Sequence, residues 1–273
     1  MRLACIQLNP QNNVAKNVER AENLIIEAAK NKAKVIVLPE MFSFMGADAE
    51  RASNANEAGT GVFSTIQRLA QKLQVYIIGG SHAETSPHTS RVFNTSESYS
   101  PTGEMINRYR KIHLFNLFAE NGEKLFCESD AFEAGNECKS FYIKSNNEQW
   151  TALTAICYDL RFPEIFRQKL QKTEPLDIIF LPAAFTHQTG KDHWEVLVRA
   201  RAIENQCYVV ACNQTGTFLN GTKRNYGHSI IVSPWGEIIS QFNDEIGILY
   251  AEVSKQEISA ARKKLPAVWN RTL

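Results

Sequence analysis

The sequence predicts an α/β protein in which two mixed β-sheets pack face to face and helices cover both outer faces. Short apolar strand patterns alternate with amphipathic helical patterns along the chain, which indicates repeated β–α–β units. Three segments of the first half recur in the same order in the second half, which indicates two similar halves related by a pseudo-two-fold axis. A chain of 273 residues without an obvious linker can bury one large core, so we expect a single domain over residues 1–273.

Hydrophobic periodicity predicts the elements of the first half. Apolar side chains three or four positions apart predict helices at 16–30 and 61–73. Short apolar runs predict strands at 35–38 and 76–78, which are buried on both sides. The short run at 2–8 predicts a first strand, because a signal peptide needs a longer apolar stretch and a cleavage site of small residues.

The second half repeats this order of elements. Strands are expected at 152–156 and 178–181, and a last helix is expected at 255–264, where Ser254 and Glu257 suit a capping box. Two Ser-Pro-x-Gly-Glu sequences suit hairpin turns, because Pro and Gly set the turn dihedral angles. The matched segments are 38–42 with 181–185, 74–78 with 206–210, and 100–106 with 233–239.

Two connecting segments lack periodicity. Residues 84–91 are polar and predict a hairpin loop. Residues 116–140 carry several Gly, Asn and Glu residues and are long for a structureless connection. Long loops are often functional, so this second segment is a candidate part of a site.

The composition excludes several classes of protein. Lys+Arg 30 against Asp+Glu 29 gives a net charge of +1, which predicts neither nucleic acid nor a membrane as the main partner. No apolar run approaches the roughly 18 residues that a membrane-spanning helix needs. The 6 cysteines include no CxxC pair and are too few for a disulfide scaffold, so a cytoplasmic location is expected.

Cys157 is the candidate nucleophile. It follows an apolar strand and precedes Pro163, which suits the first turn of a helix. A thiol where a strand passes into a helix can be exposed, and the backbone N–H groups there favour an anion. The alternative is a buried structural cysteine, the interpretation that we favour for Cys5, Cys207 and Cys212.

A cysteine nucleophile needs a base and a group that stabilises an oxyanion. Glu40 is the candidate base, because it follows a buried strand and partial desolvation makes a carboxylate more basic. Lys111 could stabilise an oxyanion, or it could belong to a solvated basic strand edge. A histidine could replace Glu40 as the base, but the 6 histidines match no usual zinc spacing, so no metal is expected.

Six sequence blocks, taken together and in order, resemble one known family. They lie at 38–42 (LPEMF), 109–114 (YRKIHL), 157–164 (CYDLRFPE), 193–195 (HWE), 199–205 (RARAIEN) and 226–229 (YGHS). The first three resemble the signature blocks of the nitrilase (carbon–nitrogen hydrolase) superfamily. The match covers nearly the whole chain.

This resemblance implies a four-layer αββα sandwich and a Glu–Lys–Cys triad. It implies Glu40 as general base, Cys157 as nucleophile, and Lys111 as the group that stabilises the tetrahedral intermediate. It also implies that the backbone N–H of Tyr158 assists Lys111, and that Glu128 positions the lysine or the attacking water. The implied reaction hydrolyses a small amide through a cysteine thioester without a metal or an organic cofactor.

The resemblance also points to a substrate class. The blocks are most similar to the branch that contains deaminated glutathione amidase and omega-amidase, and residues 193–210 lean toward the first. Omega-amidase action on α-ketoglutaramate or α-ketosuccinamate, and N-carbamoyl amine hydrolysis, stay open as alternatives. Keto-acid amides carry carboxylates, so a cationic residue should face the pocket, with Arg161 and Arg199 as candidates. The family further implies a homodimer or a higher homo-oligomer.

Overall fold

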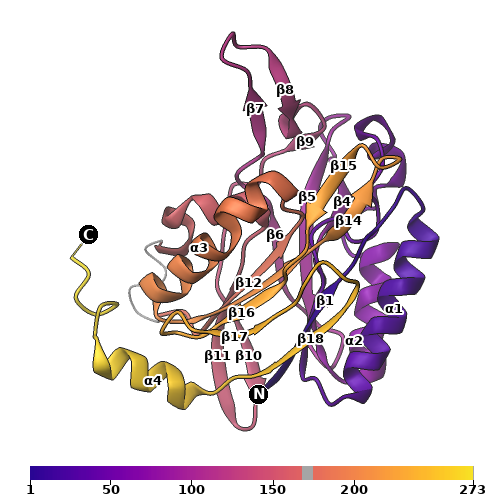
Figure 1. Ribbon diagram of the computed structural model, residues 1–273. Coiled ribbons are helices and arrows are strands. Elements are labelled where there is room, and N and C mark those ends of the chain that lie inside the picture. The colour runs from indigo at the N-terminus through magenta and orange to yellow at the C-terminus, as the bar shows by residue number, and fades with distance from the viewer. Residues whose placement is uncertain (168–174, 273) are drawn as a thin grey trace.

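The computed structural model describes residues 1–167 and 175–272. Two mixed β-sheets pack face to face, and helices lie on the outer face of each sheet (Figure 1). Helices α1 (Val14–Lys30) and α2 (Val62–Leu73) cover the first sheet, and helix α3 (His187–Asn205) covers the second. The four-layer αββα arrangement that the motif blocks imply is therefore confirmed.

The first sheet contains eight strands, and its main path runs in the order β18-β1-β2-β3-β5-β4. Strands β6 and β9 both pair with β5 off this path. The strands are β1 (Arg2–Gln7), β2 (Val35–Val37), β3 (Tyr76–Ile78), β4 (His82–Thr85), β5 (Val92–Tyr99), β6 (Met105–Arg110), β9 (Phe132–Glu133) and β18 (Gly247–Glu252).

The second sheet contains six strands in the order β10-β11-β12-β13-β16-β17. They are β10 (Phe141–Ser145), β11 (Glu148–Thr154), β12 (Ile178–Ala183), β13 (Tyr208–Asn213), β16 (Ile230–Val232) and β17 (Ile238–Gln241). Two separate ribbons complete the strands, β7 (Asn116–Phe118) with β8 (Lys124–Cys127), and β14 (Thr215–Phe218) with β15 (Lys223–Tyr226).

The pairing pattern confirms two similar halves. Strands β1, β2 and β3 are parallel, and β3 then pairs antiparallel with β5. Strands β11, β12 and β13 are likewise parallel, and β13 pairs antiparallel with β16. The two Ser-Pro-x-Gly-Glu sequences join β5 to β6 and β16 to β17, as hairpin turns closed by equivalent backbone hydrogen bonds.

The helices begin and end at residues that the sequence marks. The Asn13 side chain accepts a hydrogen bond from the Lys16 N–H at the start of α1. Gln74 and Gln206, which occupy matched positions in the two halves, both end their helices in the left-handed conformation. The capping-box prediction for α4 (Lys255–Lys264) is half right, because Ser254 caps the helix but the Glu257 carboxylate accepts from the Tyr208 hydroxyl.

Three apolar layers hold the sheets and helices together. Leu3, Val37, Trp150 and Phe180 belong to the layer between the two sheets. A second layer lies under α1 and α2, and a third lies under α3. No helix in the described ranges combines the length and the apolar character needed to cross a membrane.

Two segments differ from the sequence prediction. Residues 116–140 are not a structureless connection: they form the β7–β8 hairpin, which projects from the body (Figure 1), the short 3-10 helix η3 (Glu128–Asp130), and β9. After Cys157 the chain forms two short 3-10 helices, η4 (Cys157–Arg161) and η5 (Pro163–Arg167). In the described part of the chain, the remaining short helices are η1 (Asp48–Glu50) and η2 (Ala52–Asn54).

Gly80, just after β3, is expected to be important for the stability of the fold. Its φ is +59°, and a Cβ would lie 2.2 Å from the Pro39 carbonyl oxygen. Gly80→Ala therefore combines a backbone clash with a strained dihedral, and we expect it to lower the free energy of unfolding by about 3 kcal/mol in urea titrations. The control is Gly122→Ala, at φ +81° with open space around it, with an expected loss of about 1 kcal/mol. Equal losses would contradict this account.

Candidate active site

The candidate site lies where strands of both sheets end. Glu40 follows β2 after two residues, and Lys111 directly follows β6. Cys157 comes from the other sheet, three residues after β11. The chain leaves each strand at the same edge of the sandwich, so residues far apart in the sequence meet there.

Lys111 lies between two carboxylates. Its Nζ donates to Glu40 Oε1 at 2.9 Å and to Glu128 Oε2 and Oε1 at 2.8 and 3.0 Å. The exposed fractions are 2% for Lys111, 4% for Glu40 and 7% for Glu128, so all three charges are buried. A buried charge is tolerated only when it is paired and hydrogen-bonded, and this cluster meets that requirement.

The cluster fixes the charge of the lysine. Burial by itself would lower the pKa of Lys111, but the carboxylates of Glu128 and Glu40 outweigh it and raise that pKa well above its usual value. Lys111 is therefore an ammonium throughout the neutral range. Its fixed positive charge suits it to stabilise an oxyanion and makes it unsuitable as a proton acceptor.

Cys157 holds an unusual backbone conformation. Its φ is +49°, a region in which residues other than glycine are strained, and such strain is often found at active sites. The residue keeps partial surface accessibility, whereas Cys5, Cys207 and Cys212 are fully buried in the core. The core interpretation is confirmed for those three. Cys127 and Cys157 are both partly exposed, and of these two Cys157 lies beside Glu40 and Lys111.

The Cys157 thiol is held in its protonated form. Burial raises its pKa first, and the nearby Glu40 carboxylate raises it further, both by its charge and through a hydrogen bond from the thiol. The Lys111 ammonium and the Ala184 backbone N–H act in the opposite direction but do not outweigh these two effects. The pKa is therefore well above its usual value, and the thiol proton lies next to Glu40, which can accept it.

Three contributors to the site were missed by the sequence reasoning. Asn94, on β5, donates from Nδ2 to Glu40 Oε1 at 2.8 Å. Gln214 donates to the Glu40 carbonyl oxygen at 2.6 Å and holds the backbone there. Ala184 follows β12 and supplies its N–H to Cys157. A polar residue within a buried strand signals Asn94, but nothing in the sequence signals which atom it contacts.

Of the two supporting residues of the prediction, Glu128 belongs to the buried cluster and Tyr158 adjoins Cys157. Glu128 begins η3, and the Phe115 N–H donates to its Oε2 at 2.7 Å. Tyr158 directly follows Cys157, and its ring packs edge-on against Phe115 at 5.1 Å. Both residues thus connect the base of the β7–β8 hairpin to the candidate triad.

The two candidate arginines lie in different places. Arg161 ends η4, four residues after Cys157, and its guanidinium lies 5.9 Å from the Tyr158 ring centre and 5.4 Å from that of Phe185. Arg199 instead donates to the Gly236 carbonyl oxygen at 2.9 Å, in the turn between β16 and β17. Arg161 therefore lies on the side of the candidate nucleophile, and Arg199 is engaged at an outer turn.

Histidine does not occupy the position of a base. Within residues 1–167 and 175–272, the groups that act on the Cys157 sulfur are Glu40, Lys111 and Ala184. Burial lowers the pKa of His82 to about 4, and its ring nitrogens contact Ser43 and Asn56. No cluster of three or more His, Cys, Asp or Glu side chains suited to a metal occurs among the described residues.

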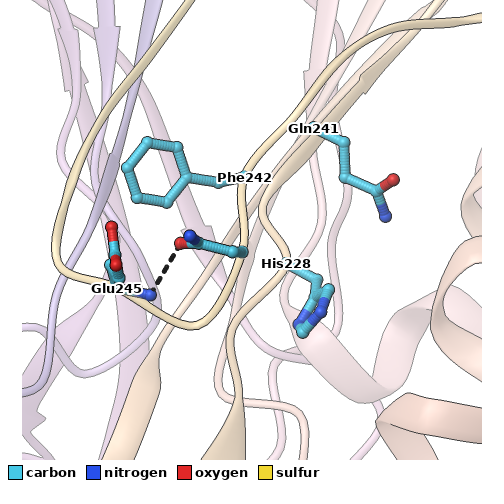
Figure 2. Close-up of a pocket in the computed structure, with 5 residues that line it drawn as sticks. His228, Gln241, Phe242 and Glu245 are labelled. Atoms are coloured by element: carbon cyan, nitrogen blue, oxygen red, sulfur yellow. Dashed lines mark hydrogen bonds between the residues drawn. The ribbon is translucent and has the colours of Figure 1, made fainter.

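A separate hollow of about 440 Å³ opens between the β15–β16 and β17–β18 connections (Figure 2). Glu245 donates its N–H to Asn243 Oδ1 at 2.9 Å on one side of it. Its lining, within the described chain, comes from the second half and not from the candidate triad: His228, Gln241, Phe242, Asn243 and Glu245. This hollow is therefore distinct from the candidate active site.

An αββα sandwich with a buried Glu–Lys–Glu cluster beside an accessible cysteine is typical of a thiol hydrolase of carbon–nitrogen bonds. The family comparison agrees: the sequence profile described as Carbon-nitrogen hydrolase matches residues 2–263, and the chain belongs to this family. The family prediction made from the six sequence blocks is thereby confirmed. The protein is a hydrolase that acts on amides.

Individual relatives match over the full length of the chain. Deaminated glutathione amidase of Synechocystis is 35% identical over 270 residues, covering 98% of this chain and 97% of the relative. Omega-amidase NIT2 of Danio rerio is 33% identical over 280 residues, covering 99% and 94%.

Solved structures agree with the fold. The Caenorhabditis elegans NitFhit protein superposes with a TM-score of 0.90 and 32% identity, covering 99% of this chain and 65% of that one. Saccharomyces cerevisiae Nit3, described as a member of branch 10 of the nitrilase superfamily, superposes with a TM-score of 0.86 and 28% identity. That match covers 100% of this chain and 97% of Nit3.

Removal of the buried ammonium should destabilise the fold. Lys111→Met leaves Glu40 and Glu128 buried and unpaired, and we expect a loss of about 3–5 kcal/mol in the free energy of unfolding at pH 7. The folded pKa of Lys111 is raised, so its contribution is complete below the ordinary lysine pKa of about 10.4 and declines as the pH rises through the folded value. The difference in the free energy of unfolding between Lys111→Met and the parent protein should therefore narrow as the pH rises through the folded pKa of Lys111.

The matched control for this experiment is Lys124→Met. Lys124 also pairs with a carboxylate, Asp130, at 2.8 Å, but both side chains are 61% exposed. Exposed ion pairs contribute little, so this variant should unfold like the parent protein. Equal stability of Lys111→Met and Lys124→Met would contradict a structural role for the buried cluster.

Proposed function

We propose that this hydrolase converts a small carboxylate-bearing amide to the acid and ammonia, with Glu40, Lys111 and Cys157 as its catalytic residues. The observation that carries the proposal is the Cys157 thiol beside the Glu40 carboxylate, which is itself held by a buried ammonium. Nucleophile, base and a stabilising cation are the three groups that acyl transfer needs.

In the first half of the reaction, Glu40 takes the thiol proton and the Cys157 sulfur attacks the amide carbon. Negative charge develops on the amide oxygen, where Lys111 Nζ and the Tyr158 N–H stabilise it. The C–N bond then breaks, Glu40 returns its proton to the leaving nitrogen, and ammonia departs. Cys157 remains as a thioester.

In the second half, Glu40 removes a proton from water, which attacks the thioester carbon. The same oxyanion partners act again, and the C–S bond breaks to release the acid. The sulfur leaves as a thiol with the proton that Glu40 held. Glu128 positions Lys111 during both steps, because it binds Nζ with both oxygens and is itself held by the Phe115 N–H.

We propose deaminated glutathione as the substrate. The proposal is supported by the similarity to deaminated glutathione amidase of Synechocystis and by Arg161, a cation that can bind a substrate carboxylate. The second candidate is omega-amidase activity on α-ketoglutaramate or α-ketosuccinamate, which the similarity to omega-amidase NIT2 supports. Both candidates use the same three catalytic residues.

The association of the protein is also part of the proposal. Val196 and Ile203 on α3 are 68% and 49% exposed, and Trp235 and Ile239 in the adjoining hairpin are about 40% exposed. An exposed apolar patch of this kind supports association, and we propose a homodimer or a higher homo-oligomer. The 6 free cysteines support a reducing, cytoplasmic location.

Ammonia release from four compounds tests the reaction and the substrate. The panel is deaminated glutathione, α-ketoglutaramate, an N-carbamoyl amine and an aliphatic nitrile. We expect deaminated glutathione to give the highest kcat/KM, and Cys157→Ala to lose about 10⁴-fold or more because the nucleophile is gone. A preference for α-ketoglutaramate would assign the protein as an omega-amidase, and a preference for the nitrile would overturn the amide assignment.

Glu40→Gln tests which residue is the base. A glutamine cannot accept the thiol proton, so we expect kcat to fall about 10² to 10⁴-fold. His82→Gln is the matched control, since it alters a histidine at the same edge of the first sheet. An active Glu40→Gln variant would show a cysteine–histidine mechanism instead.

Arg161→Ala tests recognition of the substrate carboxylate. Loss of the guanidinium should raise KM about 10-fold or more and leave kcat within about 3-fold, because the cation contacts a part of the substrate remote from the reacting carbon. Arg199→Ala is the control, with an expected KM equal to that of the parent. If KM rises in Arg199→Ala and not in Arg161→Ala, Arg199 would be the residue that binds the substrate carboxylate.

A further inference from the structure

Asp159 is a fully buried carboxylate, with an exposed fraction of 0%, and it accepts four hydrogen bonds. Its Oδ1 accepts from the His113 N–H at 3.0 Å and lies 2.7 Å from His113 Nδ1. Its Oδ2 accepts from the Tyr109 hydroxyl at 2.6 Å and from the Ile156 N–H at 2.9 Å. An aspartate carboxylate has two oxygens that accept hydrogen bonds and no group that donates one. Among side chains of this size, it alone can accept from four donors that point at the same place.

The four donors come from the two segments that carry Lys111 and Cys157. Tyr109 and His113 stand two positions before and after Lys111. Ile156 immediately precedes Cys157, and the Asp159 N–H donates back to the Ile156 carbonyl oxygen at 3.1 Å. One side chain therefore joins the end of β6 in the first sheet to the turn after β11 in the second.

The strained turn at Cys157 requires hydrogen bonds of this kind to hold it. The positive φ of Cys157 is a strained conformation, of the kind that persists only where surrounding contacts hold it. The pair of hydrogen bonds between Ile156 and Asp159 closes the turn on both sides of the cysteine. The bonds to Tyr109 and His113 then fix this closed turn relative to Lys111.

We propose that Asp159 is a positioning residue that holds the Cys157 sulfur and the Lys111 ammonium at their working separation. This inference rests on the proposed function of those two residues. The hydrogen bonds of Asp159 go to Tyr109, His113 and Ile156, and not to the Cys157 sulfur. Its proposed effect on the thiol is therefore one of placement.

The test uses the isosteric variant Asp159→Asn, with Tyr109→Phe as a milder change in the same set of bonds. The asparagine NH₂ group must face one of the donors and cannot accept its hydrogen bond. The variant therefore loses part of the hydrogen-bond set while the volume of the side chain stays the same. The matched control is Asp177→Asn. Asp177 is also a buried carboxylate that accepts from a backbone N–H, that of Thr151, but it lies before β12, at the far end from Ala184.

Four quantities are measured for each protein. They are the melting temperature, the kcat and KM for ammonia release, and the rate at which iodoacetamide alkylates Cys157, followed at that residue by peptide mass spectrometry. The alkylation rate needs no substrate. It therefore tests Asp159 even if the parent protein hydrolyses none of the amides, a result that would overturn the proposed function alone.

For Asp159→Asn we expect kcat to fall about 100-fold, while KM stays within about 3-fold of the parent value. We also expect the rate at which iodoacetamide alkylates Cys157 to change about 10-fold. Tyr109→Phe should lose about 10-fold in kcat, because one charge-assisted hydrogen bond is removed. Asp177→Asn should lower the melting temperature and leave both rates unchanged.

The inference is overturned if a folded Asp159→Asn variant keeps the parent kcat and alkylation rate, or if Asp177→Asn loses both rates to the same extent. If Asp159→Asn does not fold, Tyr109→Phe is used to test the inference. A kcat and a rate of Cys157 alkylation equal to those of the parent in Tyr109→Phe would overturn the positioning role.

Discussion

A lysine ammonium buried between two carboxylates is the interaction on which the rest of the site depends. Removing three charges from water costs several kcal/mol for each ion, and only close pairing repays that cost. Glu40, Lys111 and Glu128 reach one another from β2, β6 and η3, so the pairing requires these three chain segments to be placed together. The cluster has one more negative than positive charge. Burial first, and then the Glu40 carboxylate, keep the neighbouring Cys157 thiol protonated, and Glu40 lies beside its proton.

The duplicated architecture provides a symmetric frame for an asymmetric site. The end of β2 and the end of β12 are equivalent in the two halves, but Glu40 stands at the first and Ala183 at the second. Ala184, directly after β12, presents its N–H to the Cys157 thiol. One half thus contributes the candidate base, and the other contributes the candidate nucleophile with a backbone donor. Glu40 pairs with Lys111 within the first half, but it meets the Cys157 thiol only when the two sheets are docked.

Elements with a buried face could be predicted, because burial imposes a period on the sequence. Helices α1 and α2 and strands β2 and β3 lie at or close to the predicted positions, and the matched segments correctly indicated two similar sheets. Residues 116–140 show no such period, since the β7–β8 hairpin projects from the body and Leu117, Phe118 and Leu125 remain exposed. At the base of that segment Glu128 contacts Lys111 and the Phe115 N–H, and no periodicity in the sequence records these contacts.

The sequence by itself determined the family, the order of the elements, and the residues Glu40, Lys111, Glu128 and Cys157 as a candidate set, because motif and periodicity are local properties of the chain. Only the tertiary structure decided which of these side chains touch. It also brought in Asn94, Gln214, Ala184 and Asp159, and it separated Arg161 from Arg199. The physical reason is that a hydrogen bond needs its donor and acceptor within about 3 Å. Residues 40 and 111 come within such reach when the strands of the first sheet pair, and residue 157 joins them only when the second sheet packs against the first.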